Sequence, residues 1–298
     1  MIDFHVHLFS SEDLPSKASD LPYSMPKPNV VKIYLDRLMA LGIKPELINN
    51  VHLSILPDSE NVFNSFSELD RLKQVDPERY GGIAMVGTIL ACPKYATTQR
   101  LLHPQVKGVR VVLHDAHPDS VLPKSYSSDD WLALYARLRA DQHIHIYAQE
   151  PEVNLKVLNQ IPVSLPVVID HLGSCRVNKG IADKYYQDLL KEAKIRGNVW
   201  FKGPGYRTSN SPEGVLPFTL EIVRKVGANR LILESTDAPH VGTDTEGIPY
   251  DELYDLKSAL DFTHSLARLT SNQSNLESQS LLREAYLDIL NPIERVRK

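Results

Sequence analysis

The chain of 298 residues is poor in cysteine, and its two cysteines, Cys92 and Cys175, stand alone. Neither belongs to a Cys-x-x-Cys pair, so a zinc-thiolate site is excluded and a disulfide framework is not expected. Isolated thiols are typical of proteins in a reducing compartment. The cysteine usage therefore predicts a cytoplasmic protein without structural disulfides.

The sequence also lacks the features of membrane and nucleic-acid-binding proteins. No window approaches the run of about 18 apolar residues that a membrane span needs, and the first residues, MIDFHVHLF, lack the basic region of a signal peptide. Lysine and arginine number 33 against 37 acidic residues, a formal net charge of -4, and no basic run is present. We expect a soluble protein that binds neither membrane nor nucleic acid. A homo-oligomer is left open.

A glycine-rich phosphate loop is absent after the first predicted strand, which argues against a doubly wound nucleotide-binding sheet. Eight short apolar or β-branched runs are present instead: residues 2–7, 51–56, 82–88, 107–113, 143–148, 166–171, 197–202 and 230–236. Helix-like stretches separate them: 29–41, 60–75, 94–101, 127–141, 179–194, 212–226, 250–268 and 275–290. The alternation predicts parallel βαβ units, and eight strands predict closure into a (β/α)8 TIM barrel. We interpret residues 1–298 as one such domain.

The first predicted strand reads IDFHVH and carries two histidines, His5 and His7, two positions apart. Because strand side chains alternate with a period of two, Asp3, His5 and His7 are expected inside the barrel. The apolar residues Phe4 and Val6 are expected outside, against the helices. A histidine pair that closes the first strand of a barrel favours an active-site role over simple interior packing.

The last predicted strand ends in LILES, and Asp237 and His240 follow it closely. A carboxylate at the carboxyl end of a barrel strand is typical of a catalytic residue, although this aspartate could also cap the next segment. Strands one and eight are neighbours in a closed barrel. His5, His7 and Asp237 are therefore expected to share one pocket, which the long polar loop 9–29 would cover.

Other polar residues lie in or after the predicted strands. His171 and the aspartate before it end strand six, where they fit a catalytic site or a helix cap with a surface histidine equally well. Arg110 is a charge within an apolar strand, so it either pairs with a carboxylate in the barrel or binds an anionic substrate. Tyr147 shares one face of strand five with His143 and His145. We interpret the two histidines as interior packing.

Three motifs, DFHVH at 3–7, DHLG at 170–173 and STDAPH at 235–240, stand in the order found in the amidohydrolase superfamily. The chain resembles this superfamily over nearly its whole length. More narrowly, it resembles the amidohydrolase-related family 2 branch of 2-pyrone-4,6-dicarboxylate lactonase and the sugar-acid and sulfomuconolactone lactonases, to which DHxG and Asp-x-Pro-His are more specific. The resemblance implies a TIM-barrel hydrolase that opens a lactone, which is a cyclic carboxylic ester.

The resemblance also implies roles for individual residues. Asp237 would take a proton from water as the general base, while His5, His7 and His171 would polarise the lactone carbonyl. Matching positions imply that four further residues contact the substrate: Arg110, Tyr147, Arg207 and His240. Because arginine suits bidentate binding of carboxylates, the expected substrate is a carboxylated or sugar lactone.

For metal binding, the resemblance implies at most one ion. Two-metal members of the superfamily carry a lysine on strand four and a histidine at the end of strand five, but strand four here reads GVRVVLHD and Tyr147 matches the strand-five position. A single divalent metal such as zinc would be held by His5, His7 and Asp237. The lactonase branch works without a metal, so no cofactor is expected to be required.

Some positions depart from the dicarboxylate lactonase. Ser174 and His114 lie where that enzyme has arginines, and Ala238 replaces a common tryptophan. The resemblance with these departures favours a lactone with one carboxylate, or a sugar lactone. Two alternatives remain open on the same barrel: a zinc-dependent decarboxylase of an aromatic or muconate-type acid, and a non-catalytic binding protein.

Overall fold

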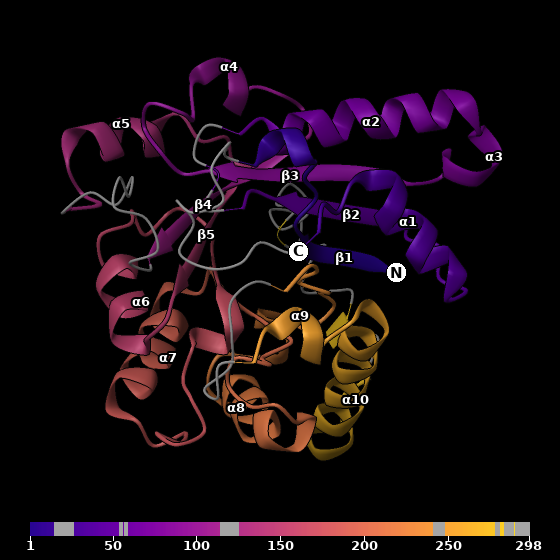
Figure 1. Ribbon diagram of the computed structural model, residues 1–298. Coiled ribbons are helices and arrows are strands. Elements are labelled where there is room, and N and C mark those ends of the chain that lie inside the picture. Colours follow the sequence, from indigo (N-terminus) through magenta and orange to yellow (C-terminus); the bar gives the residue numbers. More distant parts are fainter. Residues whose placement is uncertain are drawn as a thin grey trace.

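The computed structural model describes residues 1–14, 27–53, 56, 59–113, 125–240, 248–277, 281–282 and 289. Its strands form one parallel sheet in the order β1 to β8: Ile2–Val6, Leu47–Val51, Ala84–Leu90, Val106–Leu113, His143–Ala148, Val167–Ile169, Val199–Lys202 and Leu231–Ile232. Backbone hydrogen bonds join β1 to the segment after β8, from Phe4 N to Glu234 O at 3.1 Å and from Asp237 N to His5 O at 2.8 Å. The predicted (β/α)8 TIM barrel is thus confirmed (Figure 1).

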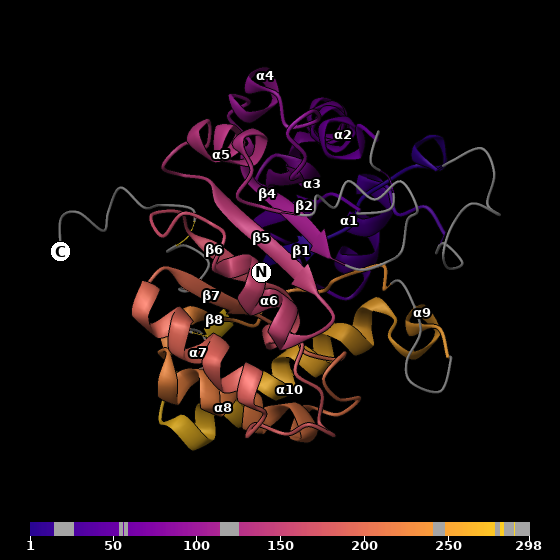
Figure 2. The same cartoon turned by 90° about the vertical axis from the view of Figure 1, so that its left-hand side faces the viewer.

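Helices surround the barrel. The α-helices of the described residues are α1 Val31–Ala40, α2 Asn61–Val75, α3 Pro77–Tyr80, α4 Thr98–Leu101, α5 Asp129–Ala136, α6 Pro151–Leu158, α7 Lys184–Arg196, α8 Pro212–Lys225, α9 Tyr250–Leu253 and α10 Leu256–Ser274. Helices α8 and α10 pack together on the side of the barrel away from α2, as both views show (Figures 1 and 2). Within the described ranges, no helix is both long and apolar enough to cross a membrane.

Capping residues explain why some helices begin and end where they do. Asp183 accepts a hydrogen bond from Tyr186 N at 2.9 Å and starts α7, and Gly197 ends it with a left-handed φ of 69°. Asp255 accepts one from Ser258 N at 2.7 Å and starts α10. The helix predicted at 250–268 is therefore two helices, because this cap begins a new one after α9.

The second strand lies elsewhere than predicted. It is Leu47–Val51 rather than 51–56. Two asparagines interrupt the apolar run in its sequence, LINNV, and both are buried. Asn49 Nδ2 donates to Phe4 O at 2.9 Å, and Asn50 Nδ2 donates to Ser65 Oγ at 2.8 Å, so hydrogen bonds compensate their burial. Most of the predicted helix 275–290 and of the loop 9–29 falls outside the described residues.

Strand β1 has an irregularity that changes which side chains face the barrel interior. Its register against β2 shifts between Asp3 and Val6, as in a β-bulge. As a result Phe4 turns inward, where its ring centroid lies 5.8 Å from the rings of His143 and His145. Asp3 turns outward and accepts a hydrogen bond from Tyr34 of α1. The prediction for these two residues was wrong, because a bulge breaks the period of two on which it depended.

The barrel interior is apolar near the beginnings of the strands and polar near their ends. The apolar cluster comprises Ile2, Phe4, Val168, Trp200, Ile232 and Ile289, with Leu47 packed against it. A larger core lies between the sheet and the helices. The interior cluster closes the amino-terminal side of the barrel, so polar side chains collect at the carboxyl-terminal side, where TIM-barrel active sites lie.

Candidate active site

The carboxyl ends of the strands bring the predicted catalytic residues together. His5 lies in β1 and His7 directly follows it. His171 lies in the 3-10 segment η3, Asp170–Gly173, and Asp237 lies after β8. All four side chains are buried, so the alternative of a surface histidine after strand six is wrong. Asp237 and His171 have positive φ angles of 53° and 48°, a conformation that is uncommon outside glycine and clusters at functional sites.

Asp237 is anchored through one carboxylate oxygen. Its Oδ1 accepts hydrogen bonds from Ser235 Oγ at 2.8 Å and from Nζ of Lys202, a fully buried residue of β7. Its Oδ2 is buried without a hydrogen-bond partner among the described residues, and it lies 3.7 Å from His171 Nδ1. The second oxygen is therefore left to interact with a bound molecule.

A second carboxylate, Asp170, lies on the other side of Lys202. Its Oδ1 is 2.9 Å from Lys202 Nζ and 2.9 Å from His145 Nε2, and its Oδ2 accepts from Arg110 Nη2 at 3.2 Å. Burial would raise the pKa of this carboxyl, but His145, Lys202 and His5 together hold its pKa well below the usual range. Of the two alternatives for Arg110, the structure shows the ion pair with a carboxylate.

A chain of directional hydrogen bonds links Lys202 to both histidines of β1. His7 Nδ1 lies 2.7 Å from Val51 O, which can only accept, so His7 carries its proton on Nδ1. The bare Nε2 of His7 then accepts from His5 Nε2 at 3.1 Å, and His5 Nδ1 accepts from Lys202 Nζ at 3.0 Å. Burial, followed by the nearby cations, holds the pKa of both histidines well below its ordinary value, so each carries one proton. The hydrogen-bond partners thus assign both tautomers.

Two predicted substrate-binding residues lie beside His171. Arg207, which follows β7, donates from Nε to His171 Nε2 at 3.2 Å. The Tyr147 ring meets the His171 ring edge-on at 5.2 Å, and the Arg207 guanidinium lies 5.5 Å from the centre of the tyrosine ring. Burial, followed by the charge of Lys202, holds the pKa of His171 well below its ordinary value. A neutral imidazole, an arginine and a tyrosine therefore form one wall of the site.

His240 has a different place from the other predicted contacts. Its Nε2 lies 2.8 Å from Thr236 O and its Nδ1 lies 3.0 Å from Tyr254 O. Both ring nitrogens thus face backbone carbonyl oxygens, one just before Asp237 and the other just before α10. In this arrangement His240 connects the turn that follows Asp237 to the start of α10.

Nearly the whole barrel matches one known family. A sequence profile described as amidohydrolase covers residues 2–268. The chain belongs to the amidohydrolase family. The resemblance carried by the three motifs is thereby confirmed, and members of the family are enzymes that act on small molecules. No curated protein matched this amidohydrolase.

Solved structures share the fold of this amidohydrolase. A probable 2-pyrone-4,6-dicarboxylic acid hydrolase from Acinetobacter baumannii, with citric acid bound, is 20% identical with a TM-score of 0.71, over 97% of this chain and 98% of that chain. A candidate 2-pyrone-4,6-dicarboxylic acid hydrolase from Pseudomonas putida is 24% identical with a TM-score of 0.68, over 97% of each chain. A 2,6-dihydroxybenzoate decarboxylase in complex with 2,6-dihydroxybenzoate is 12% identical with a TM-score of 0.55, over 98% and 100%. At these identities the likeness shows the fold alone.

The sequence reasoning missed Lys202 and underrated His145. Lys202 ends the apolar strand VWFK, which is the same signal, a charge in a buried strand, that singled out Arg110. His145 is inside the barrel, as expected, but its contact with Asp170 makes it part of the site of this amidohydrolase rather than packing alone. The contact joins β5 to the end of β6, and no spacing within one strand indicates it.

The predicted ligand set for a single metal does not converge in this amidohydrolase. His5 faces His7 through Nε2 but faces Asp237 Oδ1 through Nδ1, at 3.4 Å, so the two partners lie at opposite nitrogens of one ring. A metal centre is usual in the family, and one group that could hold an ion is present among the described residues: His5, His145 and Asp170, with ligand atoms within 4.8 Å of one another. Lys202 Nζ, however, lies 3.0 Å from His5 Nδ1 and 2.9 Å from Asp170 Oδ1, so an ammonium already takes both ligands. With Lys202 in this position, the residues do not fit a divalent metal.

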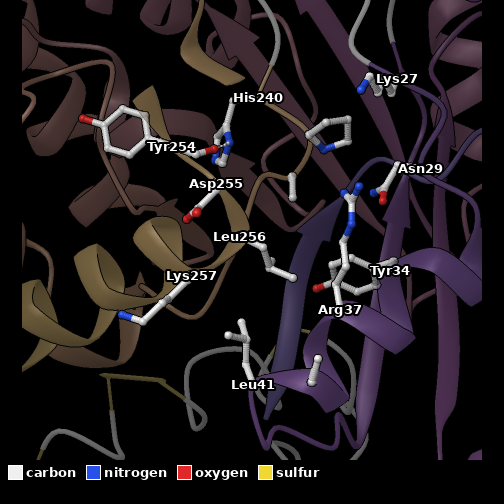
Figure 3. A pocket seen from close by; sticks show the side chains of 13 residues that line it. Lys27, Asn29, Tyr34, Arg37, Leu41, His240, Tyr254, Asp255, Leu256 and Lys257 are labelled. Carbon is white, nitrogen blue, oxygen red and sulfur yellow. Dashed lines mark hydrogen bonds between the residues drawn. The ribbon is translucent and has the colours of Figure 1, made fainter. Parts of the chain in front are cut away.

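A pocket of about 530 Å³ lies outside the barrel, between α1 and the start of α10 (Figure 3). Figure 3 shows Tyr34 and Arg37 on one wall and His240 and Leu256 on the other. None of the four predicted catalytic residues lines it. It adjoins the back of the turn after Asp237 and is separate from the candidate site.

Proposed function

We propose that this amidohydrolase hydrolyses a lactone, with Asp237 as the general base. The observation that carries the proposal is the asymmetry of this carboxylate, whose Oδ1 is held by Ser235 and Lys202 while the buried Oδ2 faces His171 without a hydrogen-bond partner among the described residues. A carboxylate fixed in this way can hold a water molecule and accept its proton. Membership of the amidohydrolase family and the likeness to two proteins named as 2-pyrone-4,6-dicarboxylic acid hydrolases support the same reaction.

The proposed reaction needs one proton acceptor and hydrogen-bond donors for an oxyanion. The water oxygen attacks the lactone carbonyl carbon while Asp237 takes one proton from the water. The N–H group of His171 donates to the carbonyl oxygen as it becomes an oxyanion. His5 and His7 support the site instead, because the N–H of His5 donates to His7 and the N–H of His7 donates to Val51 O. The ring C–O bond then breaks, and the proton on Asp237 passes to the leaving oxygen. The new carboxylic acid ionises, so one proton is released for each ring opened.

The proposed substrate carries a single carboxylate, or is a sugar lactone. Arg110 is paired with Asp170 through its Nη2 and donates from Nη1 to His52 O at 3.1 Å, so its charge is committed to the protein. Arg207 lies at the wall formed with His171 and Tyr147, and we assign it the substrate carboxylate. Tyr147, in the same wall, would contact the ring of the lactone.

Hydrolysis of a lactone panel, followed by proton release, tests this function. The panel spans sugar-acid lactones, muconolactones and 2-pyrone-4,6-dicarboxylate. We expect the wild-type chain to open at least one of them, and Asp237→Asn to lose about 100-fold to 10,000-fold of the rate, the usual contribution of a general base. Asp183→Asn is the matched control because it makes the same change at the cap of α7, away from the site, and it is expected to keep wild-type activity.

The result also separates the alternatives. Release of carbon dioxide from an aromatic or muconate-type acid, with no lactone opened, would replace the proposal by a decarboxylase. Binding of a lactone without turnover by the wild-type chain would point to the non-catalytic alternative. An Asp237→Asn variant that folds and keeps full lactonase activity would remove Asp237 from the mechanism.

A further inference from the structure

Lys202 has the surroundings of a bound cation rather than of a surface lysine. Its side chain is fully buried inside the barrel, at the end of β7. An ammonium has three N–H donors and no acceptor, and Lys202 Nζ has three acceptors around it. They are Asp170 Oδ1 at 2.9 Å, His5 Nδ1 at 3.0 Å and Asp237 Oδ1. Burying a lysine is costly unless its charge and donors are compensated, and here two hydrogen bonds, to His5 and Asp237, and an ion pair with Asp170 do so.

The charges of the cluster balance without any further cation. Asp170 and Asp237 contribute two negative charges, and Lys202 and Arg110 contribute two positive ones. A divalent metal added to this buried cluster would leave two positive charges uncompensated among the described residues, and it would meet the ammonium at the oxygen and nitrogen atoms it needs.

We propose that the Lys202 ammonium is the resident cation of this site and takes the place that a divalent metal would occupy between His5, Asp170 and Asp237. Lys202 is then a positioning residue, which acts through Asp237 by fixing Oδ1. His5 is fixed by the same ammonium, because its Nδ1 accepts from Lys202. The inference concerns the cation and not the substrate, so it stands whether or not the chain opens lactones.

Removal of Lys202 is the direct test, with metal content as the readout. The wild-type chain, Lys202→Ala and Lys202→Ala/Asp170→Asn are incubated with excess zinc, desalted and analysed for bound metal. We expect no stoichiometric zinc in the wild type. Lys202→Ala frees three ligand atoms on two carboxylates and one imidazole and is expected to retain about one zinc ion per chain. The double variant, which lacks one of these carboxylates, is expected to lose that zinc again.

A matched control and a second measurement keep the test decisive. Lys184→Ala removes an exposed lysine of α7 that pairs with Asp188, and it is expected to bind no more zinc than the wild type. One tightly bound zinc per wild-type chain, lost in Asp170→Asn, would overturn the proposal, and so would a folded Lys202→Ala that binds no zinc. If Lys202→Ala does not fold, calorimetric titration of the wild type with zinc decides: no stoichiometric binding supports the proposal, and one tight site overturns it.

Discussion

Arg207 Nε donates a hydrogen bond to His171 Nε2 across 3.2 Å, and this bond determines which nitrogen of the imidazole carries the proton. Arginine has no acceptor, so the nitrogen that faces it must be bare. His171 is neutral, because burial and then Lys202 hold its pKa well below the ordinary value. Its proton is therefore on Nδ1, the atom that lies 3.7 Å from Asp237 Oδ2. Arg207, after β7, thus directs the Nδ1–H of His171, at the end of β6, towards the carboxylate of Asp237, after β8.

Loss of this bond should release the tautomer of His171. Arg207→Met removes the donor, so the proton is free to occupy either nitrogen. We expect kcat/KM on the lactone substrate to fall by at least about 100-fold, the usual effect of losing one oxyanion donor. The ¹⁵N NMR shifts of the His171 ring should change from one tautomer to a mixture. Arg224→Met, at an exposed side chain of α8, is the control. A variant with an unchanged tautomer would contradict the assignment.

The hydroxyl of Tyr34 should stabilise the fold more at high pH than at low pH. Burial, partly offset by hydrogen bonds from Thr236 and Tyr34, raises the pKa of Asp3 to about 6. Below that pKa the carboxyl is protonated, and above it the buried carboxylate depends on its donors. We expect Tyr34→Phe to lose about 1.5 to 3 kcal/mol at pH 8, the range for a hydrogen bond to a charged group, and less at pH 5. Urea unfolding at both pH values measures this. Tyr185→Phe, at an exposed side chain of α7, should change neither, whereas equal losses at both pH values would count against the role of Asp3.

Glu234 should make the protein less stable as the pH rises towards neutrality. Burial raises the pKa of this carboxyl from 4.5 to about 7. Between these two pH values the folded chain holds a proton that the unfolded chain releases, so the stabilisation is complete below pH 4.5 and is lost as the pH rises through 7. Glu234→Gln removes this dependence. It should be more stable than the wild type by about 3 to 4 kcal/mol at pH 8, since one pKa unit corresponds to about 1.4 kcal/mol, and of similar stability at pH 4.5. Thermal or urea unfolding of both proteins across this range tests it, and identical pH profiles would contradict it.

Gly108 should resist substitution because β4 and β5 approach closely inside the barrel. A Cβ at this position would lie 2.6 Å from Cε1 of His143, whose ring is fully buried. We expect Gly108→Ala to cost about 1 to 3 kcal/mol of unfolding free energy, as overpacking does. Gly82→Ala is the matched control, because a Cβ there meets no atom within 4 Å and the backbone is not left-handed. Its stability should equal or slightly exceed that of the wild type. Equal stabilities of the two variants would show that the interior relaxes at no cost.

Particular residues show why some of the site was predictable and some was not. His5, His7 and Asp237 could be found because each stands at the end of a predicted strand, and strand ends converge in a barrel. Lys202 stands at such an end too, but its meaning depends on Asp170 and Asp237, which lie on either side of it in the closed barrel. No local pattern in the sequence states which two carboxylates one lysine will meet.

The sequence by itself determined the barrel, the family, and the positions of the proposed catalytic residues after strands one, six and eight, because strand and helix periodicity and motif order are local properties of the chain. Tertiary structure alone decided the inward turn of Phe4, since a bulge arises from pairing between β1 and β2. It also decided the second strand, whose buried asparagines are compensated by partners on other elements. Tertiary structure also decided the surroundings of Lys202, because the groups that compensate its charge come from three different strand ends and meet only when the barrel closes.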